Sequence, residues 1–115
     1  MSSPFDYRWW HPELNVMENE LNIVHLDLFS QIRNGKVIPL LYTGLKDSKG
    51  NKIYEDDIIE CWGRNLRIVW CNGDASFFAE SVDGTIFESG QEWGNNCEVV
   101  GNIYQNKELL NEGSD

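Results

Sequence analysis

The stretch that decides the fold is LLYTGLKDSKGNKIYEDDII, residues 40–59. It joins the apolar run Lys36–Tyr42 to the run Asp57–Trp62 through the polar segment Asp47–Asn51. Apolar runs bounded by Asn, Asp and Gly are typical of strands, and Gly50 can supply the positive φ that a tight turn needs. The stretch therefore predicts two strands separated by a polar turn.

The segments before this stretch predict further strands. Phe5–Trp10 is aromatic and ends just before Pro12. Leu21–Phe29 alternates apolar and polar side chains and is predicted as a strand, with a short helix as the alternative because its apolar residues also suit a helical stripe. Pro39 lies inside the run Lys36–Tyr42, so this strand is expected to be an edge strand or to carry a bulge.

The chain beyond this stretch predicts a meander with two-residue turns. Its three strands are Leu66–Cys71, Ala75–Glu80 and Thr85–Glu88, which end at breaks containing Asn, Gly or Asp. The segment Glu88–Asn96 is rich in Gly and Asn, and we expect it to form a loop.

The end of the chain predicts a last strand at Cys97–Tyr104 and one helical turn at Asn106–Leu110. The tail Asn111–Asp115 has nothing to pack and is expected to fray. A chain of 115 residues fits a single domain, here residues 1–110. The frequent turns predict a mainly β fold, a small barrel or barrel-like sandwich of about five to seven short antiparallel strands with a short C-terminal helical turn.

The charge of the chain is strongly negative and unevenly distributed. Nineteen acidic and nine basic residues give a net charge of −10. Residues 68–115 contain nine of the acids and one base, Lys107. Such a field repels phosphate backbones, so direct binding to nucleic acid is not expected. The acidity either serves solubility or provides a surface for a basic partner.

The cysteines and the N-terminal sequence indicate in which cellular compartment the protein is expected. No two of the three cysteines, Cys61, Cys71 and Cys97, have the CxxC spacing. We therefore expect buried free thiols, with a disulfide or a metal site as alternatives. The N-terminus lacks a basic start followed by an apolar run, and no apolar stretch approaches the roughly 20 residues of a membrane span. We therefore expect a cytoplasmic protein that does not bind membranes.

The sequence contains no recognisable catalytic motif. His11 and His25 are the two histidines, and neither lies in a nucleophile motif. Walker, GxGxxG and HExxH motifs are missing as well. The acid cluster Glu55–Asp57 reads as a solvated turn whose carboxylates hold backbone N–H groups, with a cation site as the alternative. A non-enzymatic protein without catalytic residues, cofactor or metal is expected.

The aromatic residues divide into expected core and expected surface. Trp62, Trp70 and one of the neighbouring Phe77 and Phe78 are predicted to pack in the core, since a strand turns adjacent side chains to opposite faces. An exposed aromatic patch bordered by acids would mark a protein interface. The candidate partner-binding residues are Trp9, Trp10, Asp74, Glu80, Asp83, Glu88, Glu92, Trp93 and Glu98.

Two segments resemble the YopX family of phage and prophage proteins. They are residues 40–59 and the segment EVVGNIYQNKELL, residues 98–110. The matching residues are Tyr42–Asp47, Lys49–Gly50, Ile53–Glu55, Asp57–Ile58, Val100–Tyr104 and Leu109–Leu110, with a weaker match at Tyr7–Trp10 and Met17. Asp56 departs from the pattern, where the family usually has Gly, but Asp tolerates a left-handed backbone. The resemblance implies a mostly β, barrel-like fold and a phage genome, and it carries no activity.

These observations leave two main functional hypotheses. The first is a protein-interaction module that binds a host or phage protein in the cytoplasm of the bacterial host. The second is an acidic counter-defence inhibitor that mimics DNA and blocks a host nucleic-acid-binding protein; it requires the candidate carboxylates to share one continuous face. A minor enzyme or metal protein is a third hypothesis. Self-association through an open edge strand, at Pro39 or the aromatic N-terminal strand, is a further option.

Overall fold

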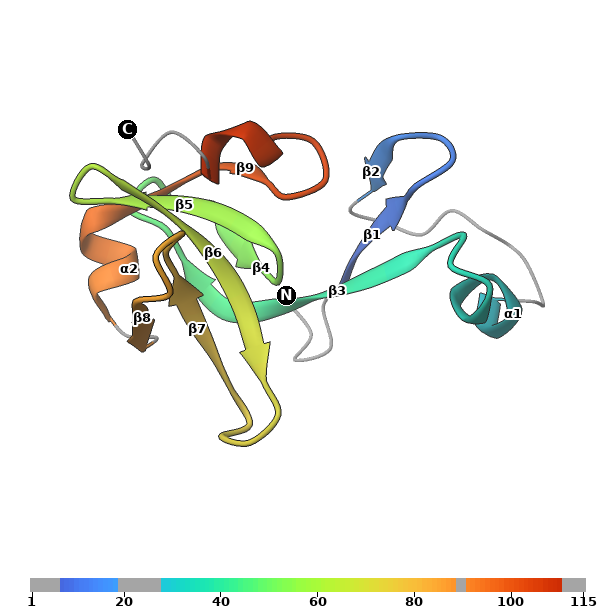
Figure 1. Ribbon diagram of the computed structural model, residues 1–115, viewed down its shortest axis with the longest axis horizontal. Coiled ribbons are helices and arrows are strands. Elements are labelled where there is room, and N and C mark those ends of the chain that lie inside the picture. Colours follow the sequence, from blue (N-terminus) through green and yellow to red (C-terminus); the bar gives the residue numbers. More distant parts are fainter. Residues whose placement is uncertain (1–6, 19–27, 89–90, 111–115) are drawn as a thin grey trace. The chain divides into compact units, whose positions relative to one another are not determined.

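The computed structural model describes residues 7–18, 28–88 and 91–110 of the chain. Two compact units divide the chain between them, Met1–Tyr42 and Thr43–Asp115. The structure consists mainly of short antiparallel strands (Figure 1). The predicted mainly β class and the C-terminal helical turn are therefore confirmed.

The elements alternate short strands with brief helical segments. The strands are β1 (Tyr7–His11), β2 (Val16–Glu18), β3 (Ile38–Lys46), β4 (Lys52–Tyr54), β5 (Asp57–Cys61), β6 (Arg64–Cys71), β7 (Ser76–Glu80), β8 (Ile86–Glu88) and β9 (Cys97–Asn102). The helical segments are α1 (Leu28–Arg33), α2 (Gln91–Asn96) and the 3-10 turn η1 (Lys107–Leu110). The strand orders are β2-β1-β3-β4 and β8-β7-β6-β5-β9.

In the first unit, β1 lies between β2 and β3. Trp10 of β1 is opposite Met17 on one side and Ile38 on the other, and its side chain is buried. Of the segment predicted as a strand at Leu21–Phe29, residues 21–27 lie outside the described residues, while its last two residues begin α1 instead. Pro39 lies opposite Trp9 of β1, and β3 as a whole is not an edge strand, since the three-residue β4 follows it in the strand order; the register around Pro39 has no bulge.

In the second unit, β6 to β8 form the predicted meander, β5 pairs with β6, and β9 returns to pair with β5. A two-residue turn connects β5 to β6 at Trp62–Gly63, outside the predicted meander, and both of its φ angles are positive, at 52° and 79°. The other two turns, at Asn72–Ala75 and Ser81–Thr85, are longer than predicted. In the second of these, Asp83 organises the extra residues by accepting hydrogen bonds from the Ser81 hydroxyl and the Thr85 N–H.

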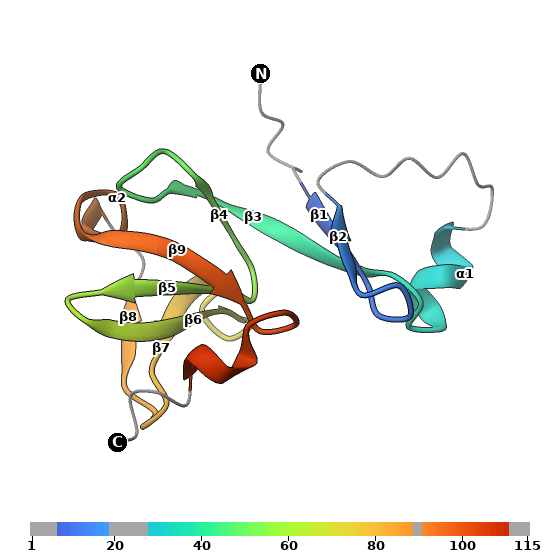
Figure 2. The ribbon, with the colours of Figure 1, turned by 90° about the horizontal axis from the view of Figure 1, so that it is seen from above.

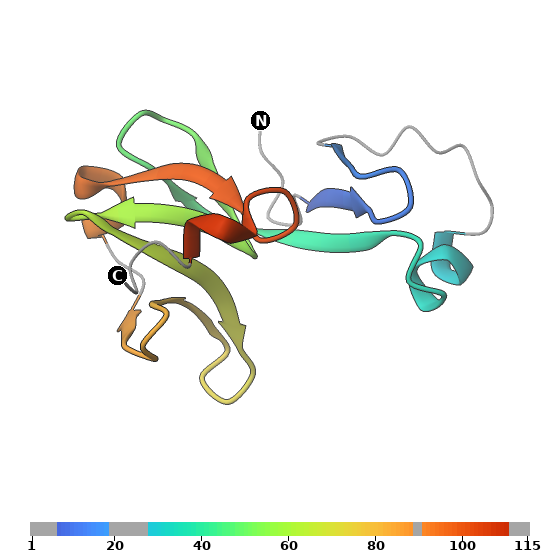
Figure 3. The ribbon, with the colours of Figure 1, turned by 45° about the horizontal axis from the view of Figure 1, so that its top comes forward.

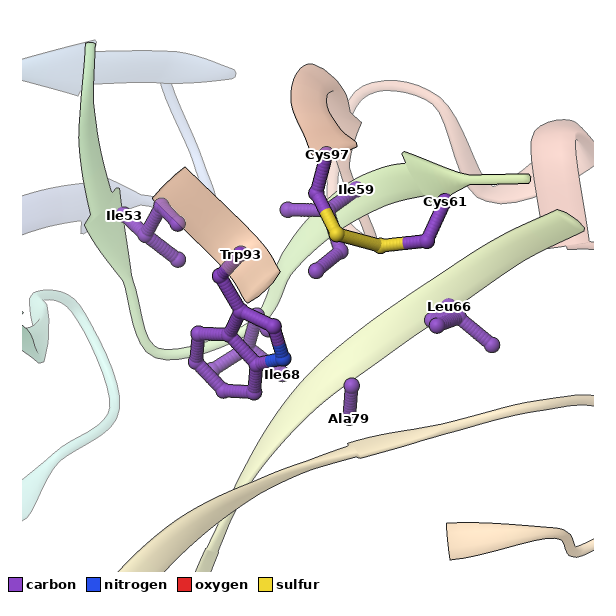
Figure 4. Packing of buried hydrophobic residues seen from close by; sticks show 8 residues of the cluster. All are labelled: Ile53, Ile59, Cys61, Leu66, Ile68, Ala79, Trp93 and Cys97. Atoms are coloured by element: carbon purple, nitrogen blue, oxygen red, sulfur yellow. A yellow bond between two sulfur atoms is a disulfide. The ribbon is translucent and has the colours of Figure 1, made fainter. Parts of the chain in front are cut away.

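The core of the second unit gathers around Trp93 (Figure 4). Its members are Ile53, Ile59, Cys61, Leu66, Ile68, Ala79, Trp93 and Cys97. Trp93 comes from α2, which occupies the segment predicted as a loop. Burial of this indole to 3% exposure explains the difference, since tertiary packing overrides the weak helix propensity of Gly and Asn.

A disulfide links β5 to β9 within this core. Cys61 and Cys97 are directly opposite each other in the strand pairing, with their Cα atoms 4.5 Å apart (Figure 4). That separation suits a disulfide between facing strand residues. The prediction of free thiols is therefore wrong for this pair, because the register that joins them cannot be read from their sequence spacing. Cys71 is a free thiol.

The turn Asp47–Asn51 covers the outer edge of β9 (Figure 2). The Ser48 N–H donates to the Cys97 carbonyl at 2.9 Å, and the Val99 N–H donates to Asp47 Oδ2 at 2.8 Å. The edge groups of the strand are thus paired within the chain, which protects it from adding another strand. The two segments that resemble the YopX pattern meet at this edge.

Two of the three residues of the acid cluster, Asp56 and Asp57, are buried, and Glu55 is half-buried. Asp57 is fully buried and its Oδ2 accepts the Tyr54 N–H at 2.8 Å, so the predicted role of holding backbone N–H groups is confirmed for this residue. Asp56 is also buried and has a φ of 67°, the left-handed conformation that an Asp in place of Gly has to adopt. The prediction of a solvated turn is wrong.

Candidate interaction surface

Two of the three tryptophans proposed as partner-binding residues lie in the core. Trp10 is 5% exposed and Trp93 is 3% exposed, so neither contributes to an exposed patch. Trp9 is half-buried, and its ring centroid lies 5.6 Å from that of Tyr7. The expectation of an exposed aromatic patch at Trp10 or Trp93 is wrong, because both indoles fill apolar space inside their own unit.

The four proposed acidic residues whose side chains the structure describes lie in four different segments of the second unit. Asp74 lies in the β6–β7 loop and Asp83 in the β7–β8 turn, at opposite ends of β7 (Figure 3). Glu98 of β9 forms an ion pair with Lys49 at 3.2 Å. Glu80 lies on β7 opposite Arg67. The side chains of the two remaining candidates, Glu88 and Glu92, lie outside the described part of the chain.

Asp83 is committed to its own turn. The hydrogen bond from the Ser81 hydroxyl, assisted by the Thr85 N–H, holds the pKa of the Asp83 carboxyl well below its usual range. The Arg64 guanidinium lies 3.4 Å away and adds a weaker favourable interaction. This carboxylate organises the β7–β8 turn and is not a free anion awaiting a partner.

The exposed aromatic surface lies at the end of the β6–β7 hairpin. On the inner face of β6, burial is complete at Leu66 and Ile68 and falls off at Trp70, which is 40% exposed. The prediction that Trp70 lies in the core is wrong. Its side chain is exposed because the β6–β7 hairpin extends past the residues that cover Ile68. Its cross-strand partner Phe77 packs against the core, whereas Phe78 points to the other face, so the prediction of one inward Phe is confirmed.

The exposed indole is held in place by its neighbours. The Trp70 and Phe77 ring centroids lie 4.9 Å apart in an edge arrangement, and Trp70 Nε1–H donates to Asn72 Oδ1 at 2.7 Å. Asp74 Oδ2 lies 3.8 Å from Cys71 Sγ in the same loop. We call Trp70, Asn72, Asp74 and Phe77 the hairpin-end patch. Two fixed contacts leave the indole little rotamer freedom to lose on binding.

Trp62 is the second exposed indole that sequence reasoning placed in the core. It is 64% exposed at the tip of the β5–β6 turn. A signal for this position was present, because a residue followed directly by Gly63 between two strand patterns indicates a two-residue turn. No corresponding signal marks Trp70, whose exposure depends on where the cover of the strand ends.

A polar network joins the buried acid to the outer face of the sheet. Asp56 Oδ1 accepts from Arg67 Nη2 at 3.0 Å and from Nε at 3.3 Å, while Oδ2 accepts the Tyr104 hydroxyl at 2.6 Å. Burial, and then the hydrogen bond to Asp56, raise the pKa of Tyr104 well above its usual range. Tyr104 therefore stays protonated as a donor at every physiological pH.

The described residues form neither a metal-binding group nor a membrane-spanning helix. Among residues 7–18, 28–88 and 91–110, no three His, Cys, Asp or Glu side chains are grouped so that they could hold a metal ion. Within those ranges, no helix has both the length and the apolar character needed to cross a membrane.

Comparison with known proteins gives a family and a similar fold. No curated protein matches the chain. A solved structure, the crystal structure of protein EF1440 from Enterococcus faecalis, is similar in fold, with a TM-score of 0.62 and 22% identity over 91% of this chain and 96% of that one. The sequence pattern of the family described as YopX protein matches residues 6–111. The chain belongs to the YopX family.

Proposed function

We propose that this chain is a non-enzymatic phage or prophage accessory protein that binds another protein through the hairpin-end patch. The observation that carries the proposal is Trp70, which is 40% exposed yet fixed by Phe77 and Asn72. Exposed, rigid tryptophans are enriched among residues that dominate binding energy, because they bury a large apolar area with little loss of freedom.

The charge around the patch favours a basic partner. Asp74 is exposed in the loop that follows β6, and residues 68–115 carry a net charge of −8. A Lys or Arg side chain of the partner can lie over the indole face, and the negative charge of this half of the chain attracts such a partner. A basic host or phage protein, including a nucleic-acid-binding one, has this chemistry.

We place this function in the host cytoplasm as part of the proposal, since that is where host and phage proteins meet during infection. The cysteines no longer support the location, because disulfides are uncommon in reducing compartments. The Cys61–Cys97 bond is compatible with it, because side chains at most 1% exposed are shielded from soluble reductants in the folded state.

The alternative role, an acidic inhibitor that mimics DNA, has less support. It needs a continuous face of free carboxylates. Asp74 and Asp83 lie at opposite ends of β7, and Asp83 and Glu98 are each paired with a cation. We therefore favour the interaction module.

Affinity capture from host lysate tests the proposal. Three baits are compared: the wild type, Trp70→Ala, and the control Trp62→Ala, which removes an exposed indole at the other end of β6. Loss of a binding hot spot lowers affinity by about 30-fold, so we expect a protein retained by the wild type and the control and lost with Trp70→Ala. Equal retention by Trp70→Ala, with its circular dichroism unchanged, would overturn the proposal.

A further inference from the structure

A second surface feature lies on the outer face of the five-stranded sheet, in the second unit. Arg67 and Glu80 are cross-strand neighbours there, on the face opposite to Ile68 and Ala79. With the β7–β8 turn and η1 they line an open pocket of about 300 Å³, the lower end of the range for small-molecule sites. Its lining residues are Arg67, Glu80, Ser81, Val82, Gly84, Lys107 and Leu110.

The charges that line this cavity are unlike those of the surrounding chain. From residue 68 onward the sequence has nine acids and a single base, and that base, Lys107, lines the cavity together with Arg67. Lys107 is exposed, and within the described part of the chain its ammonium group forms no ion pair. The lining of the hollow therefore holds two cations and one anion, Glu80, and Asp56, which is not part of the lining, pairs with Arg67 at 3.0 Å.

One of the two cations is held in a fixed orientation. Arg67 donates hydrogen bonds from Nε and Nη2 to Asp56 Oδ1, and the Tyr104 hydroxyl donates to Asp56 Oδ2. These bonds leave the N–H groups of Nη1 available. A guanidinium whose position is already fixed loses little entropy when it binds an anion.

We propose that the cavity binds the carboxylate of an aliphatic monoanion. The carboxylate lies between Lys107 and Arg67, and its aliphatic chain lies against Val82 and Leu110. Glu80 disfavours a second negative charge, so a phosphate dianion is selected against. The same carboxylate can belong to a free aliphatic acid or to the C-terminus of a peptide that ends in an aliphatic residue.

Titration followed by amide NMR shifts tests this site on the full chain. Sodium hexanoate is expected to give saturable shifts at Ser81, Gly84 and Leu110, whereas hexylammonium and sodium phosphate at equal ionic strength give none there. A tripeptide ending in Leu, compared with its C-terminal amide, identifies the source of the carboxylate. Tighter binding than hexanoate indicates a peptide C-terminus, and weaker binding a free acid. Absence of saturable shifts with either carboxylate, or equal shifts with hexylammonium, would overturn the proposal.

Charge variants sharpen the same test. Loss of one partly exposed charge partner raises the Kd by about fivefold. We expect this rise in the Kd for hexanoate in the variant Lys107→Gln. Glu80→Gln is expected to lower the Kd by a similar factor, because it removes the opposing anion. The control Lys36→Gln changes the net charge equally at an exposed position of the first unit and should leave the Kd unchanged. The same Kd in all three variants would contradict a site built from Lys107.

Discussion

Single residues at unusual backbone angles mark where the sequence departs from the simplest turn chemistry. Trp62 has a φ of 52° at the first position of a two-residue turn. Asn and Gly occupy this position at low cost, whereas a bulky side chain is strained there. The exposed indole gains no core packing in return.

Replacing Trp62 by Asn is therefore expected to stabilise the chain. The relief of backbone strain is worth about 0.5–1 kcal/mol, which raises the thermal midpoint by about 2–5 °C. Val82→Asn is the matched control, since it also removes an exposed apolar side chain but at a residue without a positive φ. Calorimetry that found the Trp62→Asn midpoint unchanged or lower would show that the turn is not strained.

Asp47 shows how one carboxylate joins two distant segments. Burial alone would raise its pKa, but hydrogen bonds from the N–H groups of Val99, Asn51 and Lys49 outweigh it, and the pKa is lowered from its ordinary 3.8. A carboxylate whose pKa is lower in the folded state contributes its full stability above the unfolded-state value. That contribution is lost as the pH falls through the folded-state pKa.

The variant Asp47→Asn is expected to lower the free energy of unfolding by about 1–3 kcal/mol at neutral pH. The reason is that the side-chain NH2 group, which replaces one carboxylate oxygen, is itself a donor and cannot accept hydrogen bonds from the backbone N–H groups. The difference from wild type should be constant between about pH 5 and 8 and shrink below about pH 4. Urea unfolding at several pH values measures it. Asp74→Asn, at an exposed position, should show no such difference; a cost for Asp47→Asn that does not change with pH would contradict this account.

At the scale of elements, the pairing of β5 with β9 is central. This pairing brings together Cys61 and Cys97, which are 36 residues apart, and it buries their disulfide among Ile59 and Trp93. The sequence could not reveal the pair, because its register follows from the return of β9 beside β5. Either cysteine alone looks like an ordinary buried thiol.

Removing this disulfide is expected to lower the free energy of unfolding by about 3–4 kcal/mol, the loop-closure value for a loop of this length. The measurement is denaturant unfolding of Cys61→Ala/Cys97→Ala against the wild type, with and without reductant. Cys71→Ala is the control, because this thiol is free. A wild type whose midpoint is insensitive to reductant in the unfolding buffer would contradict the disulfide.

Most strands could be predicted from alternation and turn residues, and the exceptions have physical reasons. The strand at Asp57–Trp62 and the turn at Asp47–Asn51 follow from local patterns and were predicted. The helix α2 was not, because it forms around the burial of Trp93 rather than from its own residues. Tertiary packing decides such short elements.

At the scale of the whole chain, the family could be predicted from two segments of the sequence. The exposed residues of the surface could not be predicted in this way. The segments 40–59 and 98–110 meet at the outer edge of β9, which explains why they carry the resemblance. The candidate site was predicted poorly, because exposure depends on where neighbouring elements end. Trp10 and Trp93 are covered, whereas Trp70 emerges at the end of its strand.

The central claim is that the hairpin-end patch binds a partner protein. The direct measurement is photocrosslinking in host cells, with a photoreactive amino acid placed at Asp74 in the patch or at Gln105, which is also exposed, outside it. The account predicts a discrete crosslinked species from Asp74, no such species from Gln105, and loss of the Asp74 product when Trp70→Ala is added. A product that forms equally from both positions, or that survives Trp70→Ala, would contradict it.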